Sequence, residues 1–363
     1  MKNDANNNCK AGSAALSGAP VILMVSGGSD STALLELASL HAHGGEPRGE
    51  TGRKLLAMYS GALAASGPLD LHCLHVNHLL RGSDSDGDEV FVQRLCAAHG
   101  IGFRAVHVDI AALTALPKAQ GMEATAREAR KDAAGSLQRE LAQRYRVADE
   151  DVRILTAHTL DDRAETFLMR SMVGTGPGGL GSIPRVNGQF VRPLLDATRQ
   201  ELRDFLFEQH PGSPASELWR EDVSNNDGSN FRSRVRTKLV PVMRELQPGF
   251  EHALARTMDL IAEEDAAWQC QAESIALRNL TWDDKGTASL PARALTGAGR
   301  PLARRVLRQC LLAVNPLARL ESRQIERVVD AVFNEAVHYA TDVDSGIRVR
   351  LEDGILTIGL IGL

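Results

Sequence analysis

The sequence predicts an α/β protein with a doubly wound, mainly parallel, Rossmann-like sheet and a smaller, mostly helical C-terminal domain. The first observation is a set of short apolar runs at 21–25, 71–76, 103–109 and 152–157. Polar and apolar residues do not alternate in these runs, which is typical of strands buried on both faces. The second observation is the helical spacing between the runs. Such strand–helix alternation favours a parallel sheet with helices on both faces.

A second domain is expected because 363 residues are long for a single domain. The stretch 210–230, HPGSPASELWREDVSNNDGSN, is rich in Pro, Ser, Asn and Gly and is the best boundary. We expect a disordered tail over 1–20, a main domain over 21–212, and a linker with a helical accessory domain over 213–363. In the accessory domain we expect helices over 231–275 and 299–338 and a final hairpin of strands 346–351 and 355–360.

Composition excludes several classes of protein. The net charge of −5 and the aromatic content of 4% argue against a positively coated surface or a base-stacking platform, although a local basic patch remains compatible with them. The five cysteines include no C-x-x-C pair, which weakens a zinc or iron–sulfur interpretation. No apolar run approaches the roughly 18 residues of a membrane span. We therefore expect a cytoplasmic protein without membrane contact.

A candidate phosphate loop follows the first predicted strand and precedes a predicted helix. Adjacent glycines let backbone N–H groups converge on an anion, hydroxyls add donors, and the helix start contributes its positive end. A carboxylate there would repel phosphate unless a divalent cation lay between them, so we expect Asp30 to hold Mg²⁺. The alternative, a tight turn with a helix cap, is less consistent with this context. The loop residues are Ser26, Gly27, Gly28, Ser29, Asp30 and Ser31.

A second candidate site lies in the stretch TAHTLDDRAETFLMR after the predicted strand 152–157. Helical spacing places Asp161 and Asp162 beside Glu165, and like charges at this spacing cost about 0.2–0.5 kcal/mol. Either aspartate alone is explained by its place near a helix start. All three together call for a cation such as a metal ion or an ammonium group. His158 directly precedes this helix.

Further candidates have strong structural alternatives. His75 ends the second predicted strand, where a lone histidine is more often structural than ligand-binding. Arg127 and Arg130 lie on a charged helix and either form a solvated ion-pair face or reach a phosphate. Two basic stretches suit contacts with an RNA backbone or are ordinary charged helix surfaces. One comprises Arg232, Arg234, Arg236 and Lys238, and the other holds seven arginines against two acids over 300–327.

The loop resembles the SGGxDS signature of the N-type ATP pyrophosphatases, which cleave ATP between the α and β phosphates. Six further segments resemble the tRNA(Ile)-lysidine synthases, in that family's order over about 21–245. These segments are HVNH…LRG (75–82), EATAREARK (123–131), AHTLDDRAET (157–166), GTGPGGLGSIP (174–184), VRPLLDATRQEL (191–202) and EDVSNND…FRSRVRTKLVPVM (221–243).

The resemblance implies a specific reaction. ATP activates C2 of the wobble cytidine in a tRNA(Ile) with a CAU anticodon, and the ε-amine of L-lysine then displaces AMP to give lysidine. It implies ATP and Mg²⁺ as cofactors, with the loop and His75 on ATP. It implies catalytic roles for Asp30, Arg127, Arg130, His158, Asp161, Asp162 and Glu165. It implies tRNA contacts for Arg232, Arg234, Arg236 and Lys238. A homodimer is compatible with the sequence.

Three positions depart from the family pattern. Thr159 stands where a second histidine is usual, Arg163 where glutamine is common, and Ser233 where asparagine is usual. The alternatives are a tRNA thiolase, which would need paired sulfur-handling cysteines, and a catalytically inactive tRNA-binding homologue. An amidotransferase is less consistent, because no glutaminase half is recognisable.

Overall fold

The computed structural model describes residues 20–63, 70–80, 82–116, 121–221, 230–343 and 346–361. The predicted tail over 1–20 lies outside the described residues except for Pro20, which begins the first strand. The described chain divides between Asp259 and Leu260 into two compact units. In the part of the chain described, no helix combines the length and apolarity needed to cross a membrane.

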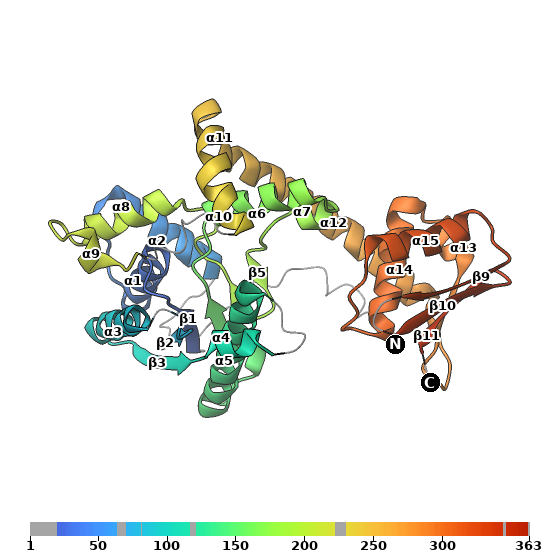
Figure 1. Ribbon diagram of the computed structural model, residues 1–363, viewed down its shortest axis with the longest axis horizontal. Helices are drawn as coiled ribbons and strands as arrows, with labels where there is room; N and C mark the ends of the chain where they lie inside the picture. Colours follow the sequence, from blue (N-terminus) through green and yellow to red (C-terminus); the bar gives the residue numbers. More distant parts are fainter. Residues whose placement is uncertain are drawn as a thin grey trace. The chain divides into compact units, whose positions relative to one another are not determined.

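The first unit is built on a six-stranded sheet in the order β3-β2-β1-β4-β6-β5 (Figure 1). All neighbours are parallel except β5 and β6, so the predicted mainly parallel sheet is confirmed. The strands are β1 (Pro20–Met24), β2 (Asp70–Asn77), β3 (Gly102–His107), β4 (Arg153–Leu155), β5 (Val186–Asn187) and β6 (Phe190–Val191).

Helices cover both faces of this sheet, as a doubly wound fold requires. Val21 and Leu23 belong to one apolar core with α1, α2, α3 and α8, whereas Ile22 belongs to another with Leu137 and Leu141 of α5. Alternate residues of a strand point to opposite faces, so β1 is buried on both sides. The helices are α1 (Ser29–His43), α2 (Gly49–Leu63), α3 (Ser83–Ala98), α4 (Ile110–Thr114), α5 (Met122–Tyr145), η1 (Asp149–Asp151), α6 (Leu160–Val173), α7 (Pro177–Leu180), α8 (Arg199–Gln209) and α9 (Ala215–Leu218).

The predicted boundary at 212/213 is corrected by the packing of the next segment. Leu218 and Trp219 are buried in the core of the first unit, and Val235 and Phe250 pack with Leu168 of α6. The described part of the Pro- and Ser-rich stretch, residues 210–221, therefore packs with the first unit, because composition reports local conformation and not long-range packing. The helices here are α10 (Phe231–Arg234), η3 (Val235–Leu239), α11 (Val240–Leu246) and α12 (Phe250–Asn279), and α12 crosses the division.

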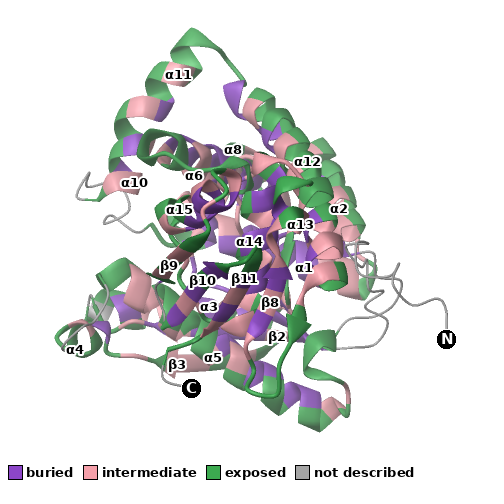
Figure 2. Ribbon diagram, turned by 90° about the vertical axis from the view of Figure 1, so that its right-hand side faces the viewer, coloured by how far each residue is buried: buried purple, intermediate pink, exposed green. Residues whose placement is uncertain are grey.

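The second unit contains more strand than the sequence predicted. Its five-stranded antiparallel sheet has the order β7-β8-β11-β10-β9, and the predicted hairpin is confirmed as β10 and β11. Buried positions alternate along β10 and gather on one side of α14 and α15 (Figure 2). The elements are β7 (Thr281–Trp282), β8 (Ala288–Pro291), α13 (Ala292–Thr296), α14 (Arg300–Val314), α15 (Ser322–Phe333), β9 (His338–Val343), β10 (Ile347–Glu352) and β11 (Ile355–Leu360).

Candidate active site

The loop between β1 and α1 folds around the hydroxyl of Ser31. This oxygen accepts hydrogen bonds from the N–H groups of Ser26 and Gly27, each at 3.2 Å, and the hydroxyl donates to the carbonyl of Gly28 at 3.0 Å. Ser31 is buried, so it organises the loop from within rather than facing a ligand. The Ser29 hydroxyl, also buried, donates to Asp30 at 3.1 Å.

Two glycines give the loop its shape. Gly27 has φ +94°, a conformation that strains any residue with a side chain. Gly28 is the N-cap residue of α1 and provides no side-chain cap, which leaves the first N–H groups of this helix open toward the loop. An uncapped helix start behind a glycine turn favours binding of an anion.

His75 contacts the backbone at the start of this loop. The ring lies at the end of β2, and its Nδ1 is 2.9 Å from the carbonyl oxygen of Val25. Only 4% of the residue is exposed, so it offers little surface to a nucleotide. Arg220 was not predicted: its N–H donates to the carbonyl of Gly27 at 2.8 Å, which fastens the segment after α9 onto the loop.

The start of α6 is fixed by a capping box. The hydroxyl of Thr159 accepts from the N–H of Asp162, and the Asp162 carboxylate accepts from the N–H of Thr159 at 3.0 Å. This pairing holds the other oxygen of Asp162 in a defined position. Asp161 and Glu165 on the same helix are 8% and 2% exposed, so three carboxylates are gathered in a largely buried place.

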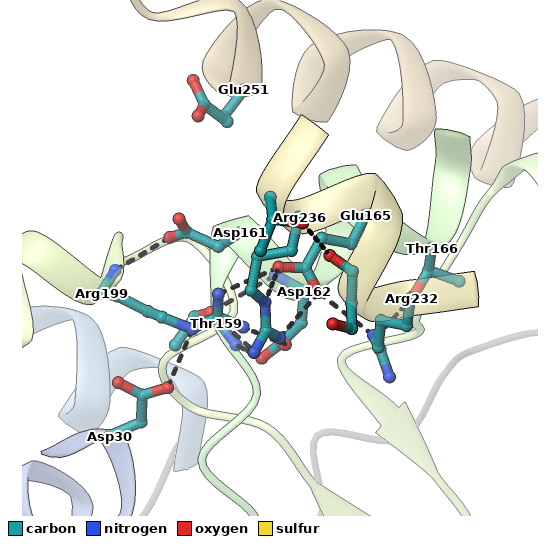
Figure 3. Close-up of polar contacts among 12 residues, drawn as sticks. Asp30, Thr159, Asp161, Asp162, Glu165, Thr166, Arg199, Arg232, Arg236 and Glu251 are labelled. Carbon is teal, nitrogen blue, oxygen red and sulfur yellow. Dashed lines mark hydrogen bonds and ion pairs between the residues drawn. The ribbon is translucent and has the colours of Figure 1, made fainter. Parts of the chain in front are cut away.

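Arg199 joins these carboxylates to the phosphate loop (Figure 3). Its Nε donates to Asp30 at 3.3 Å, its Nη1 to Glu165 at 3.0 Å and its Nη2 to Asp162 at 2.6 Å. The backbone N–H of Arg199 also donates to Asp161 at 2.9 Å. A single guanidinium therefore contacts the loop and two of the three carboxylates that we expected to bind a cation.

Two further arginines converge on Glu165. Arg236 contacts both carboxylate oxygens, at 2.7 and 2.9 Å, and Arg232 donates to Glu165 at 3.1 Å and to Thr166 at 3.0 Å (Figure 3). These two residues were predicted to contact tRNA, but in the structure both side chains bind the acidic helix. The cation that offsets the repulsion along α6 is thus supplied by arginines.

Arg244 completes what we term the Arg199 cluster. It donates to Asp161 at 2.7 Å and to Glu251 at 2.5 Å. The cluster contains five carboxylates and four guanidinium groups, so it is one positive charge short of neutrality. Its members are Asp30, Asp161, Asp162, Glu165, Glu251, Arg199, Arg232, Arg236 and Arg244.

The pKa values of the carboxyl groups in this cluster are shifted by burial and by the neighbouring charges. Burial, with Asp162 nearby, raises the pKa of Asp30 to about 6 against the opposing effect of Arg199. Burial alone would raise the pKa of Asp162, but Arg199, Arg232 and His158 lower it to about 2. Among the described residues, no group of three or more His, Cys, Asp or Glu side chains is arranged to hold a metal ion.

His158 lies between β4 and α6 with its Nδ1 2.9 Å from the Thr156 hydroxyl. Burial lowers the pKa of His158 to about 4 against the effect of Asp162, and Arg192, Arg232 and Arg127 lower it further. The imidazole is therefore neutral at pH 7. Arg127 and Arg130 on α5 are exposed, and neither contacts the Arg199 cluster in the described part of the chain.

Comparison with known proteins identifies the family. A sequence profile of the PP-loop domain matches residues 1–243. The tRNA(Ile)-lysidine synthase of Geobacter sulfurreducens is 31% identical over 325 residues, which are 87% of this chain and 59% of that protein. That of Chlorobaculum tepidum is 30% identical over 345 residues, which are 93% of this chain and 90% of that protein. This chain belongs to the tRNA(Ile)-lysidine synthase family.

The chain spans less than two thirds of the Geobacter relative, at 59% of its length. Among solved structures, the U34-tRNA thiolase NcsA from Methanococcus maripaludis with its [4Fe-4S] cluster is similar with a TM-score of 0.43. That match has 18% identity and covers 68% of this chain and 73% of that one. We draw no functional conclusion from a score of this size.

The departures from the lysidine synthase family have structural explanations. Thr159 caps α6, as described above. Arg163 is 2% exposed and bonds Asp196 at 3.0 Å and Asp259 at 2.5 Å, so it ties α12 to α6. Ser233 is 3% exposed, and its N–H donates to the side chain of Asn230 at 2.8 Å, so it lies at the capped start of α10.

The other basic candidates are placed differently from Arg232 and Arg236. Arg234 and Lys238, each two residues after one of them on the same segment, are exposed. In the second unit Arg304 forms a bidentate pair with Glu326 at 2.6 and 2.9 Å, Arg300 bonds Asp330 at 2.6 Å, and Arg305 pairs with Asp265. Much of the stripe over 300–327 is therefore an ion-paired surface, because two acids outside that window contribute.

Arg199 was the main residue that sequence reasoning missed. It is the first residue of α8, where a cation is unfavourable beside the positive end of the helix dipole. An arginine at this unfavourable position, directly after the predicted N-cap Thr198, was the one indication in the sequence that Arg199 has a special role. The capping box itself is confirmed.

Proposed function

We propose that this protein is a tRNA(Ile)-lysidine synthase. ATP adenylates C2 of the wobble cytidine in a CAU-anticodon tRNA(Ile) with release of pyrophosphate, and the ε-amine of lysine displaces AMP to form lysidine. The observation that carries the proposal is the contact of one guanidinium, Arg199, with Asp30 on one side and with Asp162 and Glu165 on the other. A nucleotide site and an amine site would thus adjoin.

The phosphate loop fits the first step. The open start of α1 and the turn at Gly27 would bind the β and γ phosphates. Magnesium is usually bound by one or two carboxylates together with substrate phosphates, and Asp30 is the carboxylate that fits this role. Bound Mg²⁺ would neutralise phosphate charge. Asp30 must then exchange its contact with Arg199 for the metal.

The Arg199 cluster fits the second step. While Asp30 contacts Arg199, the five carboxylates of the cluster exceed its four guanidinium groups by one, so the cluster can take the charge of one further cation, such as an ammonium group. An amine attacks only when neutral, so a base must take its proton. In this proposal Asp162 and Glu165 would bind the ammonium group, with His158 beside Asp162.

A thiolase finds less support. The free cysteines among the described residues are Cys73, Cys96 and Cys310, and all three are buried. A thiolate that attacks a substrate or carries sulfur has to be accessible. These side chains are core residues of the two units.

The test supplies ATP, Mg²⁺, labelled lysine and a tRNA with a CAU anticodon. We expect pyrophosphate release and a lysine adduct on the wobble cytidine, located by nuclease digestion and mass spectrometry. A tRNA with a GAU anticodon is the matched control and should gain no label. Sulfur incorporation in place of lysine, or tRNA binding without ATP turnover, would contradict the proposal.

A further inference from the structure

A second group of arginines lies at the same edge of the sheet and has no acidic partners. It comprises Arg127 of α5, Arg170 of α6 and Arg192, which directly follows β6; we term it the basic cluster. In the part of the chain that the structure describes, none of the three forms an ion pair, and the partners of Arg170 and Arg192 are backbone carbonyls. In contrast, every arginine of the Arg199 cluster contacts at least one carboxylate.

Two of these arginines are held by one loop. Arg170 donates to the carbonyls of Gly179 at 2.7 Å and Ser182 at 3.1 Å, and Arg192 donates to the carbonyl of Pro184 at 2.7 Å. Ser182 and Pro184 are two residues apart, and their carbonyls are separated by about 7 Å at most, so the two guanidinium groups bind the same short segment of this loop. Carbonyl dipoles orient them but leave their full charges unmatched.

His158 and Arg192 are brought together by the sheet. The ladder between β4 and β6 continues beyond β4, because the N–H of Thr156 donates to the carbonyl of Val191 at 3.0 Å. Arg192 is 6% exposed, and its buried Nε has no hydrogen-bond partner. A buried donor left unpaired costs about 1–3 kcal/mol, which a bound acceptor would offset.

Electrostatics agree with this geometry. Burial lowers the pKa of Arg192, and Arg127 lowers it further. Burial likewise lowers the pKa of Arg170, with Arg127 and Arg232 adding to the effect. The opposite holds for Arg199, where Asp162 and Glu165 outweigh burial and raise the pKa.

We propose that Arg170, Arg192 and Arg127 form a phosphate subsite that binds a backbone phosphodiester of the RNA beside the nucleotide to be modified. The assignment rests on the proposed function for the presence of an RNA substrate. It goes beyond that function in naming the residues that place the target nucleotide at the active site.

Distance along α6 favours the RNA phosphate over a phosphate of ATP. Asp162 lies at the first turn of α6 and is linked through Arg199 to Asp30 of the phosphate loop. Arg170 lies eight residues further along the helix, and at about 1.5 Å per residue that is roughly 12 Å away. If the triphosphate of ATP binds at the loop, the target nucleotide can occupy the space between the loop and Arg170.

The test measures binding of an anticodon stem-loop to the full chain at several salt concentrations. A lost phosphate contact reduces the slope of log K against log salt by about 0.7 for single-stranded RNA. We expect Arg170→Gln and Arg127→Gln each to lower the slope by about this amount. Arg104→Gln is the matched control, because Arg104 is exposed and paired with Glu140; its slope should not change.

A change in the RNA, combined with these protein variants, identifies which phosphate is bound. Replacing one phosphate next to the wobble cytidine by a methylphosphonate should weaken binding to the unaltered protein but not further weaken binding to Arg170→Gln. Arg192→Gln should lower the slope in the same way, whereas Arg192→Lys, which retains the charge, should keep the slope of the unaltered protein. Equal slopes in all variants and the control would overturn the proposal. So would a tenfold loss of ATP affinity with an unchanged slope, which would assign the cluster to the nucleotide.

Loss of the subsite and failure of the proposed function are distinguishable. If the unaltered protein forms the lysine adduct while the variants keep the control's salt slope, the subsite is wrong and the function stands. If RNA binding responds as expected but no adduct forms with any anticodon, the proposed function is wrong instead.

Discussion

The Arg199 cluster and the basic cluster lie at one edge of the same sheet but differ in the partners of their arginines. Arg199 contacts Asp30, Asp162 and Glu165, whereas the partner of the Arg192 side chain among the described residues is the backbone carbonyl of Pro184. The first cluster has a surplus carboxylate and suits a cation. The second has only positive charge and suits an anion. A reaction between an amine and an RNA nucleotide needs both kinds of site side by side.

The largest expected effect comes from breaking the first cluster at its most buried member. Glu165→Gln leaves Arg199, Arg232 and Arg236 with a neutral partner, and removing one partner of a buried ion pair costs about 3–5 kcal/mol. Urea unfolding monitored by circular dichroism measures the loss. Glu128→Gln is the control, since Glu128 is exposed and pairs only with Lys131; it should cost under about 0.5 kcal/mol.

The next effect separates catalysis from stability. Arg199→Gln removes the link between the phosphate loop and the amine site, and we expect kcat/KM for lysine to fall by about 100-fold, or about 2.7 kcal/mol. The control on the same helix is Arg203→Gln, because Arg203 pairs with Glu221 outside the cluster. A loss of equal size in both variants would show that α8 as a whole, rather than the Arg199 guanidinium, is responsible.

Asp30 of the Arg199 cluster and His158, which lies near the basic cluster, should contribute to stability with opposite dependence on pH. The pKa of Asp30 is raised to about 6, so its contribution to stability is full below its unfolded value near 4 and is lost as pH rises through 6. Asp30→Asn should therefore stabilise the protein above pH 6, by up to about 3 kcal/mol, and have little effect at pH 4.

His158 gives the opposite sign. Its pKa is lowered to about 4, so its contribution is present above its unfolded value near 6.5 and is lost as pH falls toward 4. His158→Gln should remove part of the protein's acid sensitivity. The melting temperatures of both variants and of the unaltered protein are measured from pH 4 to pH 8. If the change in melting temperature depends on pH in the same way for both variants, the opposite pKa shifts of Asp30 and His158 are wrong.

The smallest effect is expected in the second unit. Arg304 and Glu326 form a surface pair, and such pairs contribute about 0–1 kcal/mol. Arg304→Gln should change the free energy of unfolding by less than about 0.5 kcal/mol. A change above about 2 kcal/mol would show that the ion pairs of α14 and α15 stabilise the fold as the buried ones do.

Much of the fold could be predicted because it depends on local pattern. Runs such as 21–25 and 71–76 became β1 and β2, and the spacing from Thr198 to Glu201 became the capping box of α8. The division at Asp259 could not be predicted, because it depends on apolar side chains far apart in sequence, such as Leu168 and Phe250, that meet only in the fold.

The site was predictable in its acids and less so in its bases. Three carboxylates on one turn of a helix repel one another, so the sequence alone predicts a nearby cation, whether an arginine or a ligand. Asp161, Asp162 and Glu165 could be identified in this way. Which arginines would meet them depends on tertiary packing, and Arg199 and Arg244 are separated from their partners by 37 and 83 residues. That Arg232 and Arg236 contact RNA stays a prediction, and their contacts with Glu165 were not foreseen because spacing along the chain does not show which way a side chain points.

The most direct test of the two-cluster account is the pKa of His158, measured by NMR with labelled histidine and assigned with His158→Gln. The ring lies between Asp162 and the arginines of the basic cluster, so it reports on both. Binding of an anticodon stem-loop should raise the pKa of His158 from about 4, because a phosphate would neutralise arginines that now lower it. Lysine alone should leave that pKa unchanged or lower it. A rise with lysine, or no change with RNA, would contradict the account.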